Sequence, residues 1–446
     1  MTRQAPGLVI SAPRSGSGKT TVALGVMRAL RRRGLDVGSA KCGPDYIDTA
    51  FHAAATGRAG VNLDAWAMPP ALLAALAAKA AEDRDLLIAE GAMGLFDGAP
   101  SAHGGKGSTA DVCAVTGWPV LLVLDVSAQA QSAAAVALGL AKFDERIRTA
   151  GVILNRVASH RHGELCATAI TSVGLPVVGM LPRRDDLRLP ERHLGLVQAC
   201  ETDDVEDRLD ALGAFIEQHV DLSEILRLAS VGTAISPAAP IAIRPPGRRV
   251  AIASDAAFSF FYPHLDSAWR AAGAEIIGFS PLADEPPPEQ CDACWLPGGY
   301  PELHAHRLAA ATRFKSGLQR FAQRAPVHGE CGGFMALGRS LIDTSGRRHE
   351  MAGLLDVVTS FETRRMTLGY RSVELQADGP LGQAGDVLAG HEFHYATVVD
   401  EGEDPPFAMA SDTHSSGAWP IGARRGLVSG SFFHVIAGSP PPGSAS

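Results

Sequence analysis

Cys331 is the residue whose surroundings point most directly to covalent chemistry. It lies in GECGG, residues 329–333, after a strand-like run and before a helix-like one. A tight turn between a strand and a helix lifts a nucleophilic side chain above a sheet, and small neighbours make room for that turn. We therefore predict that Cys331 is a nucleophile. The alternative is an inert buried thiol, since free cysteine is often buried.

A nucleophilic thiol requires a base and donors for the oxyanion. The predicted base is His434, which follows a strand-like run in SGSFFHVIAG near the C-terminus. The amide of Gly332 is expected to point toward the oxyanion, and a second donor is expected at Gly299 in LPGGYPE.

A phosphate-binding loop is predicted near the N-terminus. SAPRSGSGKTT, residues 11–21, stands between a strand-like and a helix-like run, and backbone amides at such a position surround phosphate oxygens. Pro13 occupies the place where the general motif has its first glycine, so the match is incomplete. The residues predicted to bind the nucleotide are Gly16, Gly18, Lys19, Thr20 and Thr21. The alternative is an ordinary glycine-rich turn before a helix.

Four acidic residues follow two other predicted strands. Asp45 and Asp48 lie in KCGPDYIDT, and Glu90 and Asp97 lie in EGAMGLFDG. Mg²⁺ is usually held by one or two carboxylates together with phosphates and water. We predict that Asp48 and Glu90 bind Mg²⁺ with the Thr20 hydroxyl, and that the other two acids face a substrate carboxylate. Each acid alone could equally be a helix cap or a solvated loop residue.

Two further patterns have weaker interpretations. Cys291 and Cys294 form a lone CxxC without a second ligand pair, which argues against zinc. His391 and His394, in GHEFHY, are three residues apart in a strand-like run, which would place them on opposite faces. A ligand-pocket role and a plain structural role both remain open for these histidines.

The length of 446 residues predicts two domains. Short apolar runs alternate with helix-like stretches both before and after a proline-rich segment, a pattern typical of parallel sheets covered on both faces. We predict a first α/β domain over residues 1–234, a linker over 235–248 and a second α/β domain over 249–440. The motifs fall at the carboxyl ends of strands, where open sheets bind ligands.

The composition argues for a cytoplasmic protein. The net charge of −8 gives no reason to expect nucleic acid or an anionic membrane as a partner, and no apolar run is long enough to span a bilayer. The N-terminus lacks the features of a signal peptide. Seven scattered cysteines favour a reducing compartment. The oligomeric state is left open, with a homodimer among the options.

A phosphate site that activates a carboxylate and a thiol that releases ammonia together suggest glutamine-dependent amide synthesis. The sequence also resembles the cobyrinic and hydrogenobyrinic acid a,c-diamide synthases. The motifs that carry the resemblance occur in the family's order over nearly the whole chain: SAPRSGSGKTT, KCGPDYIDT, EGAMGLFDG, RHLGL, LPGGYPE, GECGGFMALG, GHEFHY and GSFFH.

The resemblance implies a P-loop synthetase domain similar to dethiobiotin synthetase and a class I glutamine amidotransferase domain with a flavodoxin-like sheet. It implies ATP and Mg²⁺ as cofactors and glutamine as the nitrogen donor. The second substrate that it implies is a corrin-type ring whose a and c acetate groups are amidated. By the same resemblance Cys331 and His434 are the glutaminase pair, and Arg365 is near the ring carboxylates unless it is merely solvated. Many class I amidotransferases have Glu two places after the histidine, but this chain has Ile436 there, so a Cys–His dyad is expected.

Three alternative functions are also compatible with these motifs. Cobyric acid synthase would amidate the other side chains of the ring. A partitioning ATPase with an inactive thiol domain would produce no glutamate from glutamine. A cysteine hydrolase with a vestigial nucleotide loop would turn over its own substrate without ATP. Whether the ring carries cobalt is also left open, although the GSFFH ending resembles members that use the metal-free ring.

Overall fold

The computed structural model describes residues 4–101, 103–187, 191–192, 195–196, 204–232, 243–413 and 417–439. The chain divides into two compact units, Met1–Pro240 and Ile241–Ser446. Most of the proline-rich segment predicted as a linker lies outside the described residues. Ile243, inside that segment, is buried in the second unit, where its carbonyl accepts a 3.0 Å hydrogen bond from the Trp269 indole.

The first unit is built on a parallel sheet with strand order β3-β2-β4-β1-β5-β6-β7, and β10 pairs antiparallel with the start of β1. Its strands are β1 (Pro6–Ser11), β2 (Val37–Cys42), β3 (Val61–Leu63), β4 (Leu86–Glu90), β5 (Val120–Asp125), β6 (Thr149–Val157), β7 (Val177–Pro182) and β10 (Ser230–Val231). Every residue of β4 is buried, as expected for a strand covered on both faces.

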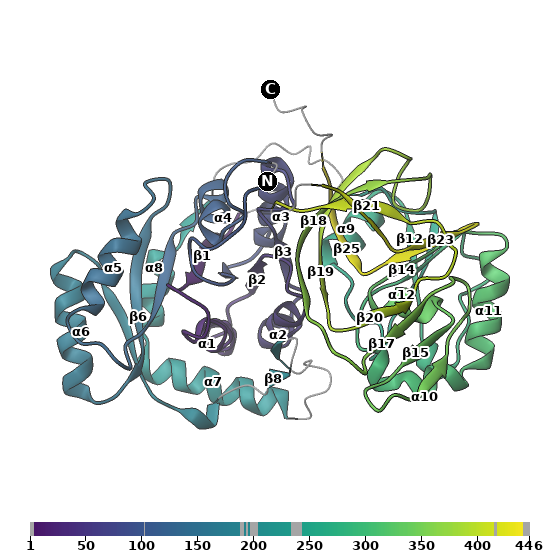
Figure 1. Cartoon of the computed structure of the whole chain (residues 1–446). Coiled ribbons are helices and arrows are strands. Elements are labelled where there is room, and N and C mark those ends of the chain that lie inside the picture. Colours follow the sequence, from purple (N-terminus) through teal and green to yellow (C-terminus); the bar gives the residue numbers. More distant parts are fainter. Residues whose placement is uncertain are drawn as a thin grey trace. The chain divides into compact units, whose positions relative to one another are not determined.

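Helices cover both faces of this sheet, with α3 and α4 on one side of β1–β3 and α1 and α2 on the other (Figure 1). Helix α1 also packs against α7, and α5 packs against α6. The helices are α1 (Lys19–Arg32), α2 (Tyr46–Thr56), α3 (Pro70–Ala81), α4 (Thr109–Thr116), α5 (Ala133–Lys142), α6 (His160–Ser172), α7 (Val205–His219) and α8 (Leu222–Leu228). A 3-10 turn at Asp185–Leu187 and the short β8 (Glu191–Arg192) and β9 (Gly195–Leu196) complete the unit.

The second unit contains a sheet with the order β12-β11-β13-β14-β24-β23, in which the first five strands are parallel. In chain order these five strands follow the 2-1-3-4-5 arrangement of flavodoxin-like folds. The strands are β11 (Arg249–Ala253), β12 (Glu275–Phe279), β13 (Ala293–Leu296), β14 (Val327–Glu330), β24 (Val428–Ser431) and the antiparallel edge strand β23 (Ala423–Arg425). The helices are α9 (Pro263–Ala271), α10 (Ala305–Ala310), α11 (Thr312–Ala322) and α12 (Gly332–Leu337), with 3-10 turns at Pro281–Ala283 and Pro301–His304.

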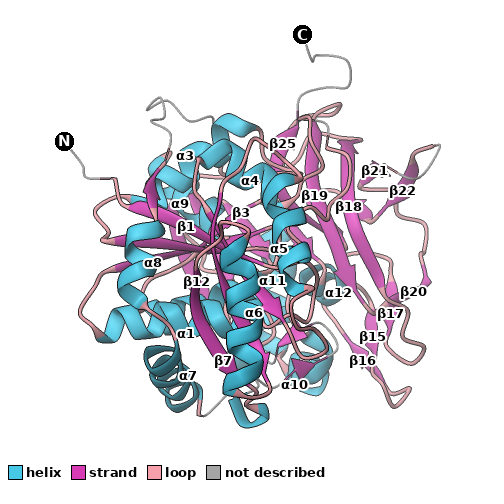
Figure 2. Cartoon of the chain, turned by 90° about the vertical axis from the view of Figure 1, so that its left-hand side faces the viewer, coloured by secondary structure: helices cyan, strands magenta, loops and turns pink. Residues whose placement is uncertain are grey.

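Two additional sheets, which the sequence analysis did not foresee, are built largely from the segment between α12 and β24. The larger is antiparallel, in the order β22-β21-β18-β19-β25, and Figure 2 shows its strands in this sequence. Its strands are β22 (Trp419–Ile421), β21 (Ala408–Ser411), β18 (Thr367–Leu375), β19 (Val387–His394) and β25 (Phe433–Ser439). The smaller comprises β16 (Arg348–Glu350), β15 (Ser340–Ile342), β17 (Val358–Ser360) and β20 (Thr397–Asp400).

The architecture confirms the predicted α/β class. Helix α1 ends at Arg32, and Gly34 adopts a positive φ of 87° in the turn that follows. In the described part of the chain, no helix combines the length and apolar character required to cross a bilayer.

Candidate active sites

The glycine-rich loop of the first unit joins β1 to α1, as predicted. Gly16 and Gly18 have φ angles of 76° and 93°, a region that side chains rarely enter. A Cβ on Gly18 would also lie 2.2 Å from the Asn155 amide nitrogen, which donates to the Ser17 carbonyl at 2.9 Å. The conformation of the glycine-rich loop therefore depends on both glycines. Asn155, near the end of β6, stabilises the loop through its hydrogen bond to Ser17.

Lys19 is held against the loops around it. Its ammonium group donates to the carbonyls of Met93 at 2.5 Å and Arg14 at 3.3 Å. Burial, together with the nearby Lys41 charge, lowers the pKa of Lys19 to about 8. A phosphate at this position would give the ammonium group an anionic partner in place of carbonyl oxygens.

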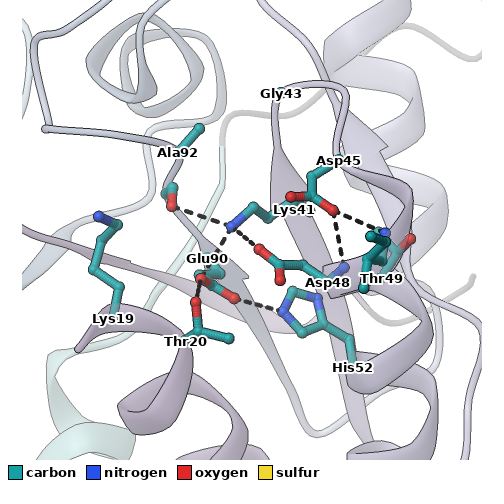
Figure 3. A network of polar contacts seen from close by, with 12 residues as sticks. Lys19, Thr20, Lys41, Gly43, Asp45, Asp48, Thr49, His52, Glu90 and Ala92 are labelled. Carbon is teal, nitrogen blue, oxygen red and sulfur yellow. Dashed lines mark hydrogen bonds and ion pairs between the residues drawn. The ribbon is translucent and has the colours of Figure 1, made fainter. Parts of the chain in front are cut away.

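Glu90 is the centre of the polar network shown in Figure 3. The Thr20 hydroxyl donates to Glu90 Oε1 at 2.6 Å, and Lys41 Nζ donates to the same oxygen at 3.0 Å. His52 Nε2 lies 2.8 Å from Glu90 Oε2, and Asp48 Oδ2 lies 2.5 Å from Lys41 Nζ. The sheet order explains this convergence, because β4 lies between β1 and β2 and Glu90 is in register with Ile10 and Lys41.

The charges within this network are strongly coupled. Burial alone would raise the pKa of Glu90, but Lys41 and the hydrogen bonds from His52 and Thr20 together hold it below its usual range. Burial likewise opposes the charge on Lys41, yet Asp48 and Glu90 outweigh it and keep that pKa above its ordinary value. Burial and the neighbouring Asp45 raise the pKa of Asp48 to about 8. The cluster thus keeps an ammonium group and a carboxylate charged in the interior.

Asp45 and Asp97 have different environments from Asp48 and Glu90. Asp45 is the N-cap of α2, and its Oδ1 accepts from the amides of Ile47 and Asp48. Asp97 is exposed, and its carboxylate accepts from the Gly94 amide at 2.9 Å. Neither acid forms part of the Lys41–Glu90 pairing, so the four predicted acids fall into two pairs.

A cavity opens beside the glycine-rich loop. Its lining includes Gly18, Thr21, Asn155, Pro182, Arg184 and Phe215. Thr21, predicted to bind nucleotide, therefore faces a space adjoining the phosphate loop. The cavity adjoins the loop at Gly18.

Cys331 of the second unit occupies a strained turn between β14 and α12. Its φ and ψ are 45° and −103°, which is an unfavourable region for a residue with a Cβ and costs on the order of 1–3 kcal/mol. Its amide donates to the Ser431 carbonyl at 2.8 Å. This is the geometry of a nucleophile elbow, the arrangement predicted from GECGG.

His434 lies next to this elbow on β25. A Cβ built on Gly298 would lie 2.4 Å from His434 Cε1 and 3.4 Å from Cys331 Cβ, so both side chains border Gly298. The His391 ring, in register with His434 on β19, stacks on it with centroids 5.1 Å apart. Tyr262 holds His391 through a 2.8 Å contact between its hydroxyl and Nε2.

Burial sets the protonation states of Cys331 and His434. Burial raises the pKa of Cys331 well above its ordinary value, with Glu302 acting in the same direction. Burial, with His391 and His394, holds the pKa of His434 well below its ordinary value. The free protein therefore contains a neutral thiol next to a neutral imidazole.

The two glycines predicted to donate to an oxyanion are neighbours in the structure. A Cβ on Gly332 would lie 3.1 Å from the Gly299 amide nitrogen, so these two residues are neighbours. A Cβ on Gly299 would lie 2.1 Å from the Ala257 carbonyl oxygen. Only glycine permits this close approach, and that explains why LPGGYPE contains a glycine there.

The other predicted ligand residues are dispersed. Arg365 is exposed in the loop before β18, whereas His391 and His394 are buried on β19 and stack on His434 and Phe432. The histidines are thus part of the surroundings of Cys331 and His434. Both cysteines of the CxxC pair are buried and free, and the described residues contain no cluster of three or more His, Cys, Asp or Glu suited to a metal ion.

Sequence reasoning missed Lys41, His52 and Asn155. A signal for His52 was present, because it lies four residues after Asp48 and therefore on the same face of α2. Lys41 is the first residue of the KCGPDYIDT motif, but its contact with Glu90 depends on β2 and β4 being neighbours in the sheet.

Comparison with known proteins agrees with this pair of sites. Residues 8–197 match the CobQ/CobB/MinD/ParA nucleotide binding domain, and residues 249–442 match the CobB/CobQ-like glutamine amidotransferase domain. The chain is therefore a nucleotide-binding P-loop domain followed by a glutamine amidotransferase domain.

Full-length relatives identify the family. The chain is 57% identical to the hydrogenobyrinate a,c-diamide synthase of Mesorhizobium japonicum, over 97% of this chain and 99% of that one. It is 55% identical to the enzyme of that name from Agrobacterium fabrum (97% and 99% covered) and 56% identical to that from Rhodobacter capsulatus (98% and 100%). The chain belongs to the hydrogenobyrinate a,c-diamide synthase family and is a glutamine-hydrolysing ligase, which confirms the resemblance found in the sequence.

Proposed function

We propose that this protein converts the a and c acetate carboxylates of hydrogenobyrinate to amides, using ATP and glutamine. The observation that carries the proposal is the presence in one chain of a cysteine elbow next to a neutral histidine and of a phosphate loop next to a buried Lys–Glu network. The names of the full-length relatives support the metal-free ring over the cobalt-containing one.

The glutaminase reaction takes place in the second unit. His434 accepts the thiol proton as Cys331 Sγ attacks the side-chain amide carbon of glutamine. The amides of Gly299 and Gly332 stabilise the oxyanion, and the imidazolium returns its proton to the leaving nitrogen, which departs as ammonia. Water then hydrolyses the thioester, which gives glutamate and restores the thiol.

The ligase reaction takes place in the first unit. A ring carboxylate oxygen attacks the γ-phosphorus of ATP and displaces ADP, which forms an acyl phosphate. Ammonia attacks the acyl carbon, phosphate leaves, and the amide forms after loss of a proton. Lys19 holds the phosphates, and the amides of Gly16 and Gly18 surround them, while Thr21 lies toward the rest of the nucleotide.

The site also fits Mg²⁺, because a hydroxyl and a carboxylate that prefers the ionised state meet beside the phosphate loop. Thr20, Glu90 and Asp48 would hold the ion, which supplies positive charge to the phosphates. Asp45 and Asp97, outside the Lys41–Glu90 pairing, would face the ring carboxylates. Exposed Arg365, in the same loop as exposed Met366, would meet ring carboxylates and apolar surface together.

The test is to incubate the protein with ATP, Mg²⁺ and glutamine together with either hydrogenobyrinate or cobyrinate, and to follow the products by mass spectrometry. We expect monoamide and then diamide, with the larger kcat/KM for hydrogenobyrinate. Reactions without ATP should yield glutamate at most. Preference for cobyrinate would overturn the ring assignment, and glutamate formation without amidation of either ring would overturn the ligase assignment.

A further inference from the structure

His434 requires a partner for the charge that it acquires during catalysis. Its side chain is 99% buried, and accepting a proton from Cys331 makes it an imidazolium in a site that disfavours charge. The position two residues further along β25 is Ile436, which is fully buried and apolar. The strand that carries the base therefore provides no carboxylate at that position.

Glu330 supplies a carboxylate from another strand. It is the last residue of β14, immediately before Cys331, and its side chain is 2% exposed. Its Oε2 lies 3.9 Å from His434 Nδ1, and its Oε1 accepts a 2.9 Å hydrogen bond from the Val435 amide. One carboxylate thus contacts the histidine ring while the backbone next to that histidine anchors its other oxygen.

We propose that Glu330 is the positioning residue for His434, and that it orients the imidazole through Nδ1 and stabilises the imidazolium formed when Cys331 is deprotonated. The proposal rests on the glutaminase function proposed above. With Nδ1 facing Glu330, Nε2 is left to receive the thiol proton. The 3.9 Å separation exceeds hydrogen-bond length, and contacts of this kind in free enzymes often shorten in the reacting complex.

The position of Glu330 in the chain supports this role. Because it directly precedes the nucleophile, the turn that fixes Cys331 also fixes the carboxylate. The elbow sequence GECGG would then carry both the nucleophile and the residue that positions its base.

Other titratable groups face the same pair. Glu302 and Glu392 act on Cys331, and His391 and His394 act on His434. Burial lowers the pKa of both His391 and His394 to about 4, so they stay neutral near pH 8. Glu392 is paired with Arg371 at 2.8 Å.

Burial raises the pKa of Glu330 to about 8, and its ionised form is the one that stabilises an imidazolium. Glutaminase activity should therefore rise with pH through this region.

The experiment compares Glu330→Gln and Glu330→Asp with wild type, with Glu374→Gln as a control at an exposed site in the same unit. Gln keeps the size and an acceptor for the Val435 amide but removes the charge, whereas Asp keeps the charge and shortens the side chain. Glutamate release gives kcat and KM for glutamine across pH. Thermal unfolding reports whether each variant is folded.

We expect Glu330→Gln to lower kcat by about 10² or more, because neutral replacement of the charged residue that orients a catalytic histidine can cost up to about 10⁴. KM should change less than about twofold, the rise in activity near pH 8 should disappear, and Glu330→Asp should retain more activity than Glu330→Gln. If Gln equals or exceeds Asp, or if the pH profile of Glu330→Gln matches wild type, Glu330 serves packing and the proposal is wrong.

A second readout separates this proposal from the glutaminase assignment. Alkylation of Cys331 by iodoacetamide, measured by mass spectrometry of its peptide, reports formation of the thiolate. Glu330→Gln should slow alkylation in the wild-type background and have no further effect when His434 is replaced by Ala, because Glu330 acts through the imidazole. Equal slowing in both backgrounds would overturn the proposal. Full glutaminase activity in Cys331→Ala would instead refute the nucleophile assignment.

Discussion

Lys41 Nζ lies 3.0 Å from Glu90 Oε1, and this contact joins the ends of two neighbouring strands beneath the phosphate loop. Both side chains are almost completely buried. Removing one member of a buried pair is strongly destabilising, because the charge that remains loses a partner in the interior.

Lys41→Met should destabilise the first unit by about 3–5 kcal/mol. The effect should be smaller when Glu90→Gln is introduced as well, since the two changes remove both charges. Lys79→Met, at a side chain that is 77% exposed, is the control and should cost less than about 1 kcal/mol. Denaturant unfolding of the wild type, the two single variants and the double variant measures the coupling between Lys41 and Glu90. If the losses of unfolding free energy from Lys41→Met and Glu90→Gln were additive, the two residues would not be coupled and the prediction would be wrong.

Lys19→Ala should remove the ammonium group that meets the phosphates. Amidation with either glutamine or ammonia should fall by about 10²–10³, because a preorganised charge of this kind contributes that much to rate. Glutamate release in the absence of ATP should remain near the wild-type rate. ATP turnover equal to wild type in this variant would reject the phosphate-loop assignment.

The two pairs of acids should respond differently to substitution. Asp48→Asn and Glu90→Gln should raise the Mg²⁺ concentration needed for half-maximal activity. Asp45→Asn and Asp97→Asn should leave that concentration nearly unchanged and allow monoamide to accumulate, since the ring must rebind in a second pose for the second amidation. Asn retains the capping ability of Asp45, so α2 should stay intact. Mg²⁺ titrations and product ratios test the division, and identical behaviour of all four variants would contradict it.

Acid should destabilise the second unit through its buried histidines. Burial lowers the pKa of His264, His391 and His394 to about 4, from an unfolded value near 6.5. Between these values the unfolded chain binds more protons than the folded one, so stability increases with pH and is lost on acidification from about 6.5 to 4. His264→Gln should reduce the slope of unfolding free energy against pH by about one proton. An unchanged slope between pH 4 and 6 would show that His264 does not contribute.

The sequence predicted the local features of both sites well. Cys331 and the phosphate loop depend on short segments in which glycine spacing, strand and helix are all readable. The contact of Lys41 with Glu90 could not be predicted from the sequence. The two residues are on strands far apart in the chain, which become neighbours only through the sheet order β2-β4-β1. The antiparallel sheet that carries His434 was missed as well, since its strands come from a long segment of weak alternation. Glu330 is part of the GECGG motif. Its contact with His434 could not be predicted, because that contact depends on the pairing of β25 within the antiparallel sheet.

The central claim is that the two units perform separable reactions, and Cys331→Ala tests it most directly. This variant should release no glutamate from glutamine and form no amide with it as the nitrogen source. With free ammonia and ATP it should amidate the ring at a rate close to that of the wild-type protein with ammonia, because the carboxylate is activated in the first unit. Loss of amidation to the same extent with both nitrogen sources would contradict the account.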